Sequence, residues 1–265
     1  MDNRPIGMFD SGVGGLTVLK QIIKEHPNEN IIYLGDTKNL PYGNKSKEVI
    51  IKLTKKGIEF LISKGVKAII IACGTATSQA LEEAQKCYDI PIIGIIDETV
   101  EYVKEKGYKN IGVIATHGTI RSKEWQNKLY KSITDAVINA KACPLLAPMA
   151  EEGWTDNEVA RLTIKEYLKD LKDVECLILG CTHYPLFSHF IKEELGEEKE
   201  IINTGKILSQ KINKELINDT IEKNEFDKKR QIQIYQTDKD ENFIKVASQI
   251  LQDEKIDEEI QIVDM

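Results

Sequence analysis

Two short stretches of this chain decide its predicted fold: Lys67-Ala-Ile-Ile-Ile-Ala-Cys73-Gly-Thr75 and Glu175-Cys-Leu-Ile-Leu-Gly-Cys181-Thr-His183. A shift of 108 positions lays the second on the first, so that apolar residues meet apolar residues and Cys73 meets Cys181. Each stretch has the pattern of a buried strand that runs directly into a cysteine and then into small polar residues. Ligands of open α/β sheets bind outside the carboxyl ends of the strands. We therefore expect both cysteines to lie where chemistry takes place.

A second pair of strands indicates an internal duplication. Pro5-Ile-Gly-Met-Phe-Asp-Ser11 aligns with Asn110-Ile-Gly-Val-Ile-Ala-Thr116 at a shift of 105 positions, which places Thr116 on Ser11. The spacing to the cysteine is 62 residues from Ser11 to Cys73 and 65 residues from Thr116 to Cys181. Chance similarity between buried strands is the alternative, and the paired spacing disfavours it. We infer two related α/β halves.

Strand patterns alternate with helix patterns along the chain, which predicts an α/β fold with doubly wound parallel sheets. The expected strands are 6–9, 31–34, 67–72, 91–96, 110–116, 136–143, 175–180, 201–202, 231–235 and 259–263. Residues 144–153 are expected to form an apolar loop that ends in two carboxylates. We place one domain at residues 1–97 plus 207–265 and the other at 98–206. A pseudo-twofold axis would relate them, with the active site in the cleft between them.

Composition excludes several classes of protein. The 265 residues are 41% apolar and 30% charged, which is ordinary for a globular protein. A net charge of −7 without a basic block argues against nucleic acid or an anionic membrane as the main partner. No apolar run approaches the about 20 residues of a membrane span, and no signal-peptide pattern is present. We therefore expect a cytoplasmic protein whose five cysteines are reduced thiols.

Two thiols on opposite sides of a cleft suit proton transfer at a stereocentre, in which one group removes a proton and the other returns one to the opposite face. A free cysteine has a pKa of about 8.5 that neighbours can lower, so it can serve as base or acid. Asp10 and His183 are candidates to hold and tune the thiols. Small hydroxyls could bind carboxylates without arginine: Ser11, Thr75, Thr116, Thr119 and Thr182. The other cysteines are expected to be buried apolar residues: Cys87, Cys143 and Cys176.

Two further motifs have competing interpretations. The turn Asp10-Ser-Gly-Val-Gly-Gly15 offers backbone N–H groups to an anion, or it is a tight turn whose Asp10 and Ser11 are helix caps. Its glycine spacing departs from the dinucleotide-binding fingerprint, which disfavours a nucleotide-binding protein. Cys181 and His183 lack a second ligand pair of the usual spacing, so we expect no metal.

The motifs taken together resemble the cofactor-independent aspartate/glutamate racemase superfamily, and within it the glutamate racemases. The resemblance covers essentially the whole chain. Besides the first cysteine strand, it rests on IGMFDSGVGGLTVL at 6–19, LPYG at 40–43, CPLLAPMAEEG at 143–153 and LGCTHYPLF at 179–187.

This resemblance implies that Cys73 takes the α-proton of D-glutamate and Cys181 that of L-glutamate, without pyridoxal phosphate or metal. It implies assisting roles for Asp10, His183 and a loop carboxylate, which maps to Glu151 with Glu152 as the alternative. It implies substrate contacts from Asp10, Ser11, Pro41, Tyr42, Gly43, Gly74, Thr75, Thr116, Thr119, Thr182 and His183. It also implies a role in supplying D-glutamate for peptidoglycan, and a homodimer.

One position departs from the family pattern. The first cysteine is usually followed by Asn-Thr, whereas this chain has Cys73-Gly74-Thr75. We expect a weaker hold on the substrate, and we expect Gly74→Asn to raise kcat/KM on glutamate. The altered position also supports an alternative, a racemase for aspartate or another amino acid. A non-catalytic amino-acid-binding homologue is a further alternative, against which the intact cysteines, Asp10 and His183 count.

Overall fold

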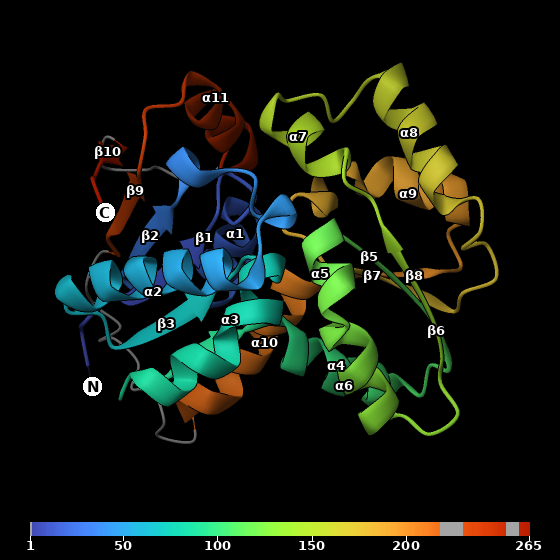
Figure 1. The fold of residues 1–265 in the computed structure, drawn as a ribbon, viewed down its shortest axis with the longest axis horizontal. Helices are drawn as coiled ribbons and strands as arrows, with labels where there is room; N and C mark the ends of the chain where they lie inside the picture. Colours follow the sequence, from blue (N-terminus) through green and yellow to red (C-terminus); the bar gives the residue numbers. More distant parts are fainter. Residues whose placement is uncertain (1, 218–229, 253–259) are drawn as a thin grey trace.

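The chain folds into two halves, each built on its own parallel sheet (Figure 1), in a computed structural model that describes residues 2–217, 230–252 and 260–265. The strands are β1 (Ile6–Asp10), β2 (Ile31–Gly35), β3 (Ala68–Ile71), β4 (Ile92–Gly94), β5 (Asn110–Ala115), β6 (Val137–Ala142), β7 (Cys176–Leu179), β8 (Glu200–Asn203), β9 (Ile232–Gln236) and β10 (Gln261–Ile262). The first half carries the sheet β10-β9-β2-β1-β3-β4, and the second half carries β6-β5-β7-β8. Every strand pairing in both sheets is parallel, which confirms the predicted fold class.

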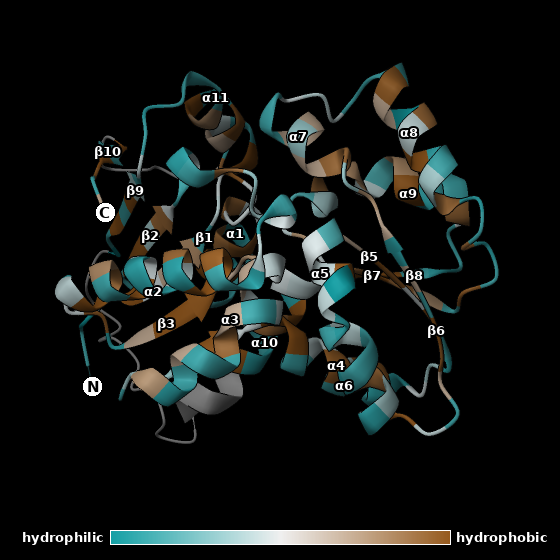
Figure 2. Cartoon of the chain, in the orientation of Figure 1, coloured by the Kyte–Doolittle hydropathy of each residue, from teal (hydrophilic) through white to brown (hydrophobic). Residues whose placement is uncertain are grey.

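Helices connect the strands and cover the sheets. They are α1 (Leu16–Glu25), α2 (Lys47–Ser63), α3 (Gly74–Cys87), α4 (Ile95–Lys106), α5 (His117–Ser122), α6 (Glu124–Ser132), α7 (Leu146–Glu151), α8 (Glu158–Leu168), α9 (Ser188–Leu195), α10 (Thr204–Ile217) and α11 (Glu241–Ile250). Three short 3-10 helices are η1 (Thr37–Asn39), η2 (Tyr42–Asn44) and η3 (Tyr184–Phe187). Figure 2 shows apolar strands under helices whose outer faces are hydrophilic. A parallel sheet covered on both faces requires such continuously apolar strands.

The two sheets repeat one strand order and one register. The order β2-β1-β3-β4 of the first half corresponds to β6-β5-β7-β8 of the second. Ile6 pairs with Ala68 in the first half, and Ile111 pairs with Cys176 in the second. The shifts of 105 and 108 positions found in the sequence carry the first pair onto the second. The duplication is therefore present in the pairing of the strands as well as in the sequence.

The end of the chain returns to the first half. β9 pairs with β2 and β10 pairs with β9, so the last strands extend the first sheet. The strand expected over 259–263 is shorter, and residue 259 lies outside the described residues. α10 packs against α1 of the first half and against α4. The pairing of strands does not show to which half the helices α4 and α10 belong. The predicted domain boundaries at 97/98 and 206/207 therefore stay a proposal.

Some elements differ from the prediction. Residues 146–151 form the helix α7, not a loop. Pro148 is compatible with this helix because it lies in the first turn, where an N–H has no intrahelical acceptor. Leu146 and Ala150 are buried on one face of α7. The strand expected over 91–96 ends at Gly94, which caps α4. The helices α5 and α6 were not predicted.

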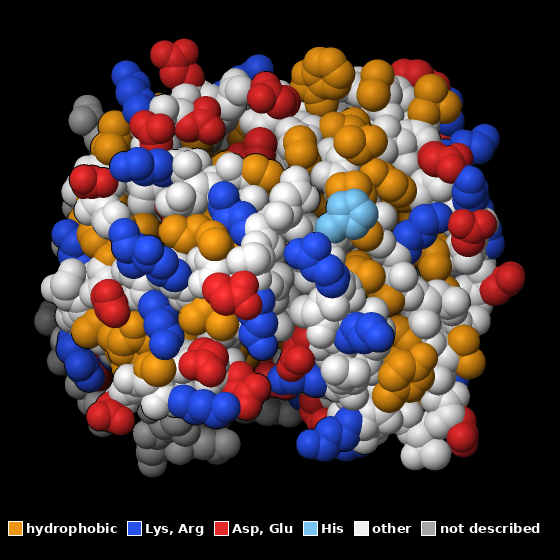
Figure 3. Space-filling model, viewed as in Figure 1, with side chains coloured by type: hydrophobic (Ala, Val, Ile, Leu, Met, Phe, Trp, Pro, Cys, Tyr) orange, Lys and Arg blue, Asp and Glu red, His pale blue; other side chains and the backbone are white. Residues whose placement is uncertain are grey.

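The surface carries mixed charge on the face drawn in Figure 3, where acidic and basic side chains are interspersed. Large apolar side chains are more than half exposed around α7 and α8: Leu145, Trp154, Val159 and Leu162. Within the described residues, none of the helices has both the length and the apolar character to cross a membrane.

Candidate active site

A cavity of about 360 Å³ lies at the carboxyl ends of the strands, walled by both halves. Twelve of the predicted site residues line it: Ser11, Pro41, Tyr42, Gly43, Cys73, Gly74, Thr75, Thr116, Glu151, Cys181, Thr182 and His183. Asp10 and Thr119 are fully buried and lie outside its lining. The duplicated strand ends thus bring both predicted thiols to one cavity.

The first thiol belongs to Cys73, which follows β3 and occupies the position before the first residue of α3, without a side-chain capping hydrogen bond. Its Sγ donates to Ser11 Oγ at 3.6 Å, and its side chain is buried. Burial, aided by the negative charge of Asp10, raises the pKa of the Cys73 thiol to about 12. Desolvation disfavours the thiolate, so Cys73 is protonated at neutral pH.

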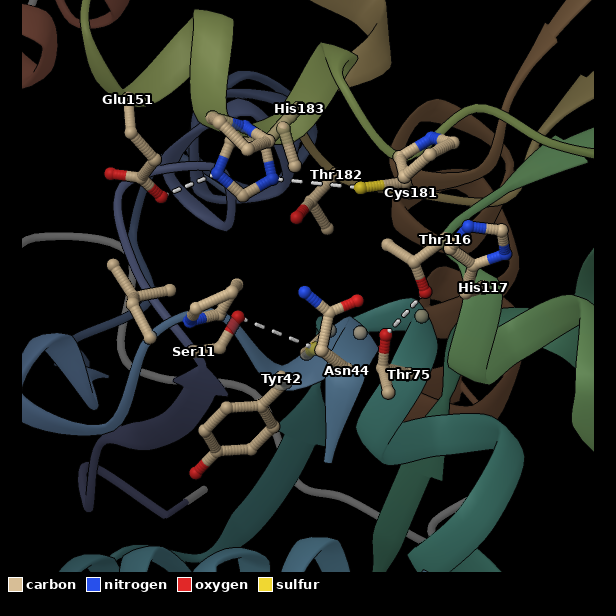
Figure 4. A pocket seen from close by; sticks show the side chains of 18 of the residues that line it. Ser11, Tyr42, Asn44, Thr75, Thr116, His117, Glu151, Cys181, Thr182 and His183 are labelled. Carbon is tan, nitrogen blue, oxygen red and sulfur yellow. Dashed lines mark hydrogen bonds and ion pairs between the residues drawn. The ribbon is translucent and has the colours of Figure 1, made fainter. Parts of the chain in front are cut away.

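The second thiol belongs to a chain of three side chains at the opposite wall (Figure 4). Cys181 Sγ lies 3.5 Å from His183 Nδ1, and His183 Nε2 lies 2.5 Å from Glu151 Oε1. Burial lowers the pKa of His183, but the charge of Glu151 and the hydrogen bonds to Cys181 and Glu151 outweigh it and raise that pKa well above its usual value. His183 is therefore a cation held between a carboxylate and a thiol, and it can stabilise a thiolate at Cys181.

The glycine-rich turn after β1, residues 10–15, packs against the side chains of Glu151 and His183. Val13 N–H donates to Glu151 Oε1 at 3.3 Å. A Cβ at Gly12 would lie 2.4 Å from that oxygen, and a Cβ at Gly14 would lie 2.6 Å from the His183 ring. The anion that this turn holds is thus a carboxylate of the protein itself. Glycine is needed here because the two halves approach so closely.

Of the two candidate carboxylates, Glu151 is the one that contacts His183. Glu152 Oε2 instead accepts from Asn242 Nδ2 at 3.0 Å, which links α7 to α11. Both carboxylates line the cavity. The assisting role of Glu151 stays a prediction, but the geometry favours it over Glu152.

Asp10 lies behind the cavity wall, where it joins the two halves. Its Oδ1 accepts from Gly12 N–H at 3.0 Å, and its Oδ2 accepts from the Thr182 hydroxyl at 3.2 Å. Burial raises the pKa of Asp10 to about 6, with opposing contributions from His183. Asp10 can therefore act on Cys73 through its charge. A direct contact between Asp10 and substrate stays a prediction.

A cluster of three hydroxyls joins the halves on another side of the cavity. Thr75 Oγ1 lies 2.9 Å from Thr116 Oγ1 and 3.2 Å from Thr119 Oγ1, and the latter two are 3.0 Å apart. Thr75 belongs to α3, whereas Thr116 caps α5. Thr119 therefore supports the two threonines of the wall from behind.

The Tyr42 hydroxyl is turned away from this chemistry, because it donates to Asp36 Oδ2 at 2.6 Å. Cys143 and Cys176 are buried as expected, but Cys87 is exposed because it ends α3 at the surface. The gain in kcat/KM expected from Gly74→Asn stays a prediction, and the geometry at Gly74 argues against it. Gly74 lies against the backbone carbonyl of Gly180, and a side chain there would overlap it.

Several lining residues were not predicted as site residues: Thr37, Leu40, Asn44, His117, Pro144, Ala147, Pro148 and Asp240. Leu40, Pro144 and Asp240 lie in connections, and the other five belong to short helices of three to six residues, where no clear period marks them. Asn44 and His117 directly follow the predicted Gly43 and Thr116, and this adjacency was the available signal. Among the described residues, no group of three or more His, Cys, Asp or Glu side chains is placed to hold a metal. The absence of a cofactor stays a prediction.

Comparison with known proteins agrees with this geometry. Residues 18–212 match the family described as Asp/Glu/Hydantoin racemase. The glutamate racemase of Geobacter metallireducens is 44% identical over 207 residues, which cover 76% of this chain and 76% of that protein. The glutamate racemase of Sulfurihydrogenibium sp. is 50% identical over 192 residues, which cover 71% of this chain and 74% of that protein. The crystal structure of Francisella tularensis glutamate racemase in complex with D-glutamate matches with a TM-score of 0.90 and 36% identity, covering 100% of this chain and 98% of that one. This chain therefore belongs to the Asp/Glu/hydantoin racemase family and is a racemase, an enzyme of the isomerase class.

Proposed function

We propose that this enzyme interconverts L- and D-glutamate by moving the α-proton between its two thiols, and that it supplies D-glutamate for peptidoglycan. The observation that carries the proposal is that Cys73 and Cys181 line one cavity from opposite halves. Glutamate as the substrate is supported by the names of the relatives and by D-glutamate bound in the Francisella tularensis enzyme.

The proposed reaction has two proton transfers. A thiolate at Cys181 removes the α-proton of L-glutamate, the carbon becomes planar, and the Cys73 thiol delivers a proton to the opposite face. The enzyme is then left with a thiol at Cys181 and a thiolate at Cys73, which is the form that acts on D-glutamate. Both thiols must therefore serve as base and as acid.

The neighbours of each thiol fit this cycle. At Cys181, the cationic His183 lies 3.5 Å from the sulfur and can donate a hydrogen bond to it. At Cys73, burial and Asp10 favour the thiol. A substrate ammonium group bound beside Ser11 would offset the charge of Asp10 and make a thiolate at Cys73 accessible.

The substrate α-carboxylate is proposed to bind at the N-terminus of α3. No side chain caps this helix, so backbone N–H groups of its first turn, at Gly74 and Thr75, are available to an anion. The hydroxyl-bearing residues Thr116 and Thr182 also line the cavity. Hydroxyl and backbone donors would replace the arginine that many carboxylate sites use.

A racemase for aspartate is the second candidate, favoured by Gly74, where the family pattern has asparagine. The deciding experiment is chiral analysis of products from L-glutamate and from L-aspartate, with no cofactor added and with a chelator present. We expect D-glutamate to form at the higher kcat/KM. Faster turnover of aspartate would support the second candidate, and no turnover of either would support a non-catalytic binding protein.

The cytoplasmic location, expected from the sequence pattern, and the homodimer, implied by the family resemblance, also remain proposals. Analytical ultracentrifugation of the purified enzyme would measure the oligomeric state directly, and a monomer at micromolar concentration would contradict the homodimer.

A further inference from the structure

The cavity has an uneven distribution of charged side chains. Three carboxylates line it, from α7 and from the residue that caps α11: Glu151, Glu152 and Asp240. No lysine or arginine is among the described lining residues. The cationic His183 is engaged by Glu151 and Cys181. A substrate that carries two carboxylates therefore needs another donor for the second one, away from these three acids.

His117 is placed to be that donor. It is the first residue of α5 and lines the cavity at the side opposite Glu151 (Figure 4). It is an exposed residue, and among the described residues its side chain has no hydrogen-bond or ion-pair partner. The imidazole ring always presents at least one N–H donor, and it is a cation when protonated.

Asn44 supplies a second donor from the first half. It ends η2, which packs against α5. The two elements meet closely, because a Cβ at Gly43 would lie 2.8 Å from the Thr116 Cβ and a Cβ at Gly118 would lie 2.9 Å from the Gly43 carbonyl oxygen. In Figure 4 the Asn44 amide extends into the cavity near Thr75 and Thr116. Its amide group offers two N–H donors.

We propose that His117, together with Asn44, binds the side-chain carboxylate of the substrate and so selects a dicarboxylic amino acid. This inference rests on the proposed function. His117 acts on binding and stays remote from the transferred proton, so its loss should change KM more than kcat.

The test compares His117→Ala with the wild type in glutamate racemisation. We expect KM for glutamate to rise about tenfold with kcat within about twofold, since a hydrogen bond to a charged group is lost. His117→Gln, which keeps a donor, should recover part of the loss. His189→Ala is the matched control, because His189 is an exposed histidine of the second half outside the cavity, and its KM should equal that of the wild type.

A second measurement distinguishes recognition of the side-chain carboxylate by His117 from a general structural effect of the substitution on activity. Exchange of the α-proton of 2-aminobutyrate, which lacks a second carboxylate, is followed in heavy water. His117→Ala should leave this exchange unchanged. An unchanged KM for glutamate, or an equal loss on both amino acids, would overturn the inference while the proposed function stands. A wild type that does not racemise glutamate would overturn the proposed function, and this inference with it.

Discussion

Gly74 packs directly against Gly180 of the other half, because a Cβ at Gly74 would lie only 2.1 Å from the Gly180 carbonyl oxygen. Real side chains do not tolerate such a contact. Gly180 directly precedes Cys181, and Gly74 directly follows Cys73. The contact thus joins the backbone beside one proposed thiol to the backbone beside the other.

We predict that Gly74→Asn lowers kcat/KM on glutamate by about a hundredfold, because a misplacement of about 1 Å at the reacting groups costs that much. The asparagine must push the N-terminus of α3 away from the Gly180 backbone. Steady-state kinetics in both directions measure the effect, and a rise in kcat/KM would show that the backbone adapts without cost.

Gly107→Asn is the control, because it makes the same glycine-to-asparagine substitution at a position away from the cavity. Gly107 ends α4 in the left-handed conformation, with φ of 76° and no atom within 4 Å of an added Cβ. Asparagine tolerates this conformation better than other side chains do. We expect this variant to retain the kcat/KM of the wild type.

The two proposed bases give a second prediction. Cys73→Ser and Cys181→Ser should each lower racemisation by about 10²–10⁴-fold, the usual contribution of a positioned acid or base. Cys87→Ser is the control, because Cys87 ends the same helix that Cys73 begins and is exposed. In heavy water, α-deuterium should appear in the product enantiomer before it appears in remaining substrate. Full turnover by either site variant would refute the two-thiol mechanism.

Glu151 and Glu152 give a matched pair of variants for the third prediction. Glu151→Gln removes the charge that keeps the pKa of His183 raised, so kcat/KM should fall about ten- to a hundredfold, the cost of one hydrogen bond to a charged group. The fall must be equal for both enantiomers because their equilibrium constant is one. Glu152→Gln should have a much smaller effect, since Glu152 contacts Asn242 and not His183. Equal losses in the two variants would contradict the assignment of Glu151.

Sequence patterns predicted the parts of the site that depend on the local chain. A run of apolar residues ending at Cys73 or Cys181 predicts a strand end, and the repeated spacing predicts that two such ends are equivalent. The fit of one half against the other could not be predicted in this way. The contact of Glu151 with the glycine-rich turn and the overlap at Gly74 depend on distances between residues more than 100 positions apart. The helix α7 was missed because it has only six residues and includes Pro148, so its sequence shows no helix period.

The buried carboxyl group of Asp10 should make the enzyme less stable above about pH 6 than below pH 3.8. Its folded pKa of about 6 exceeds the value of 3.8 for an unperturbed aspartate. The protonated form is therefore the one that folding favours. Its stabilising contribution is complete below pH 3.8 and is lost as the pH rises through about 6.

We accordingly predict that Asp10→Asn raises the free energy of unfolding at pH 8 by up to about 3 kcal/mol, from roughly two pH units at 1.36 kcal/mol each. The asparagine can keep both contacts, accepting from Gly12 N–H and donating to the Thr182 hydroxyl oxygen. The gain should shrink as the pH falls towards 4, where the aspartate of the wild type is also neutral. Urea unfolding of both proteins at pH 8, 6 and 4 measures this trend.

Asp156→Asn is the control, and because this side chain is 89% exposed, it should show no comparable gain in the free energy of unfolding at pH 8. A gain for Asp10→Asn that is the same at every pH would mean that packing, and not the buried charge, is responsible.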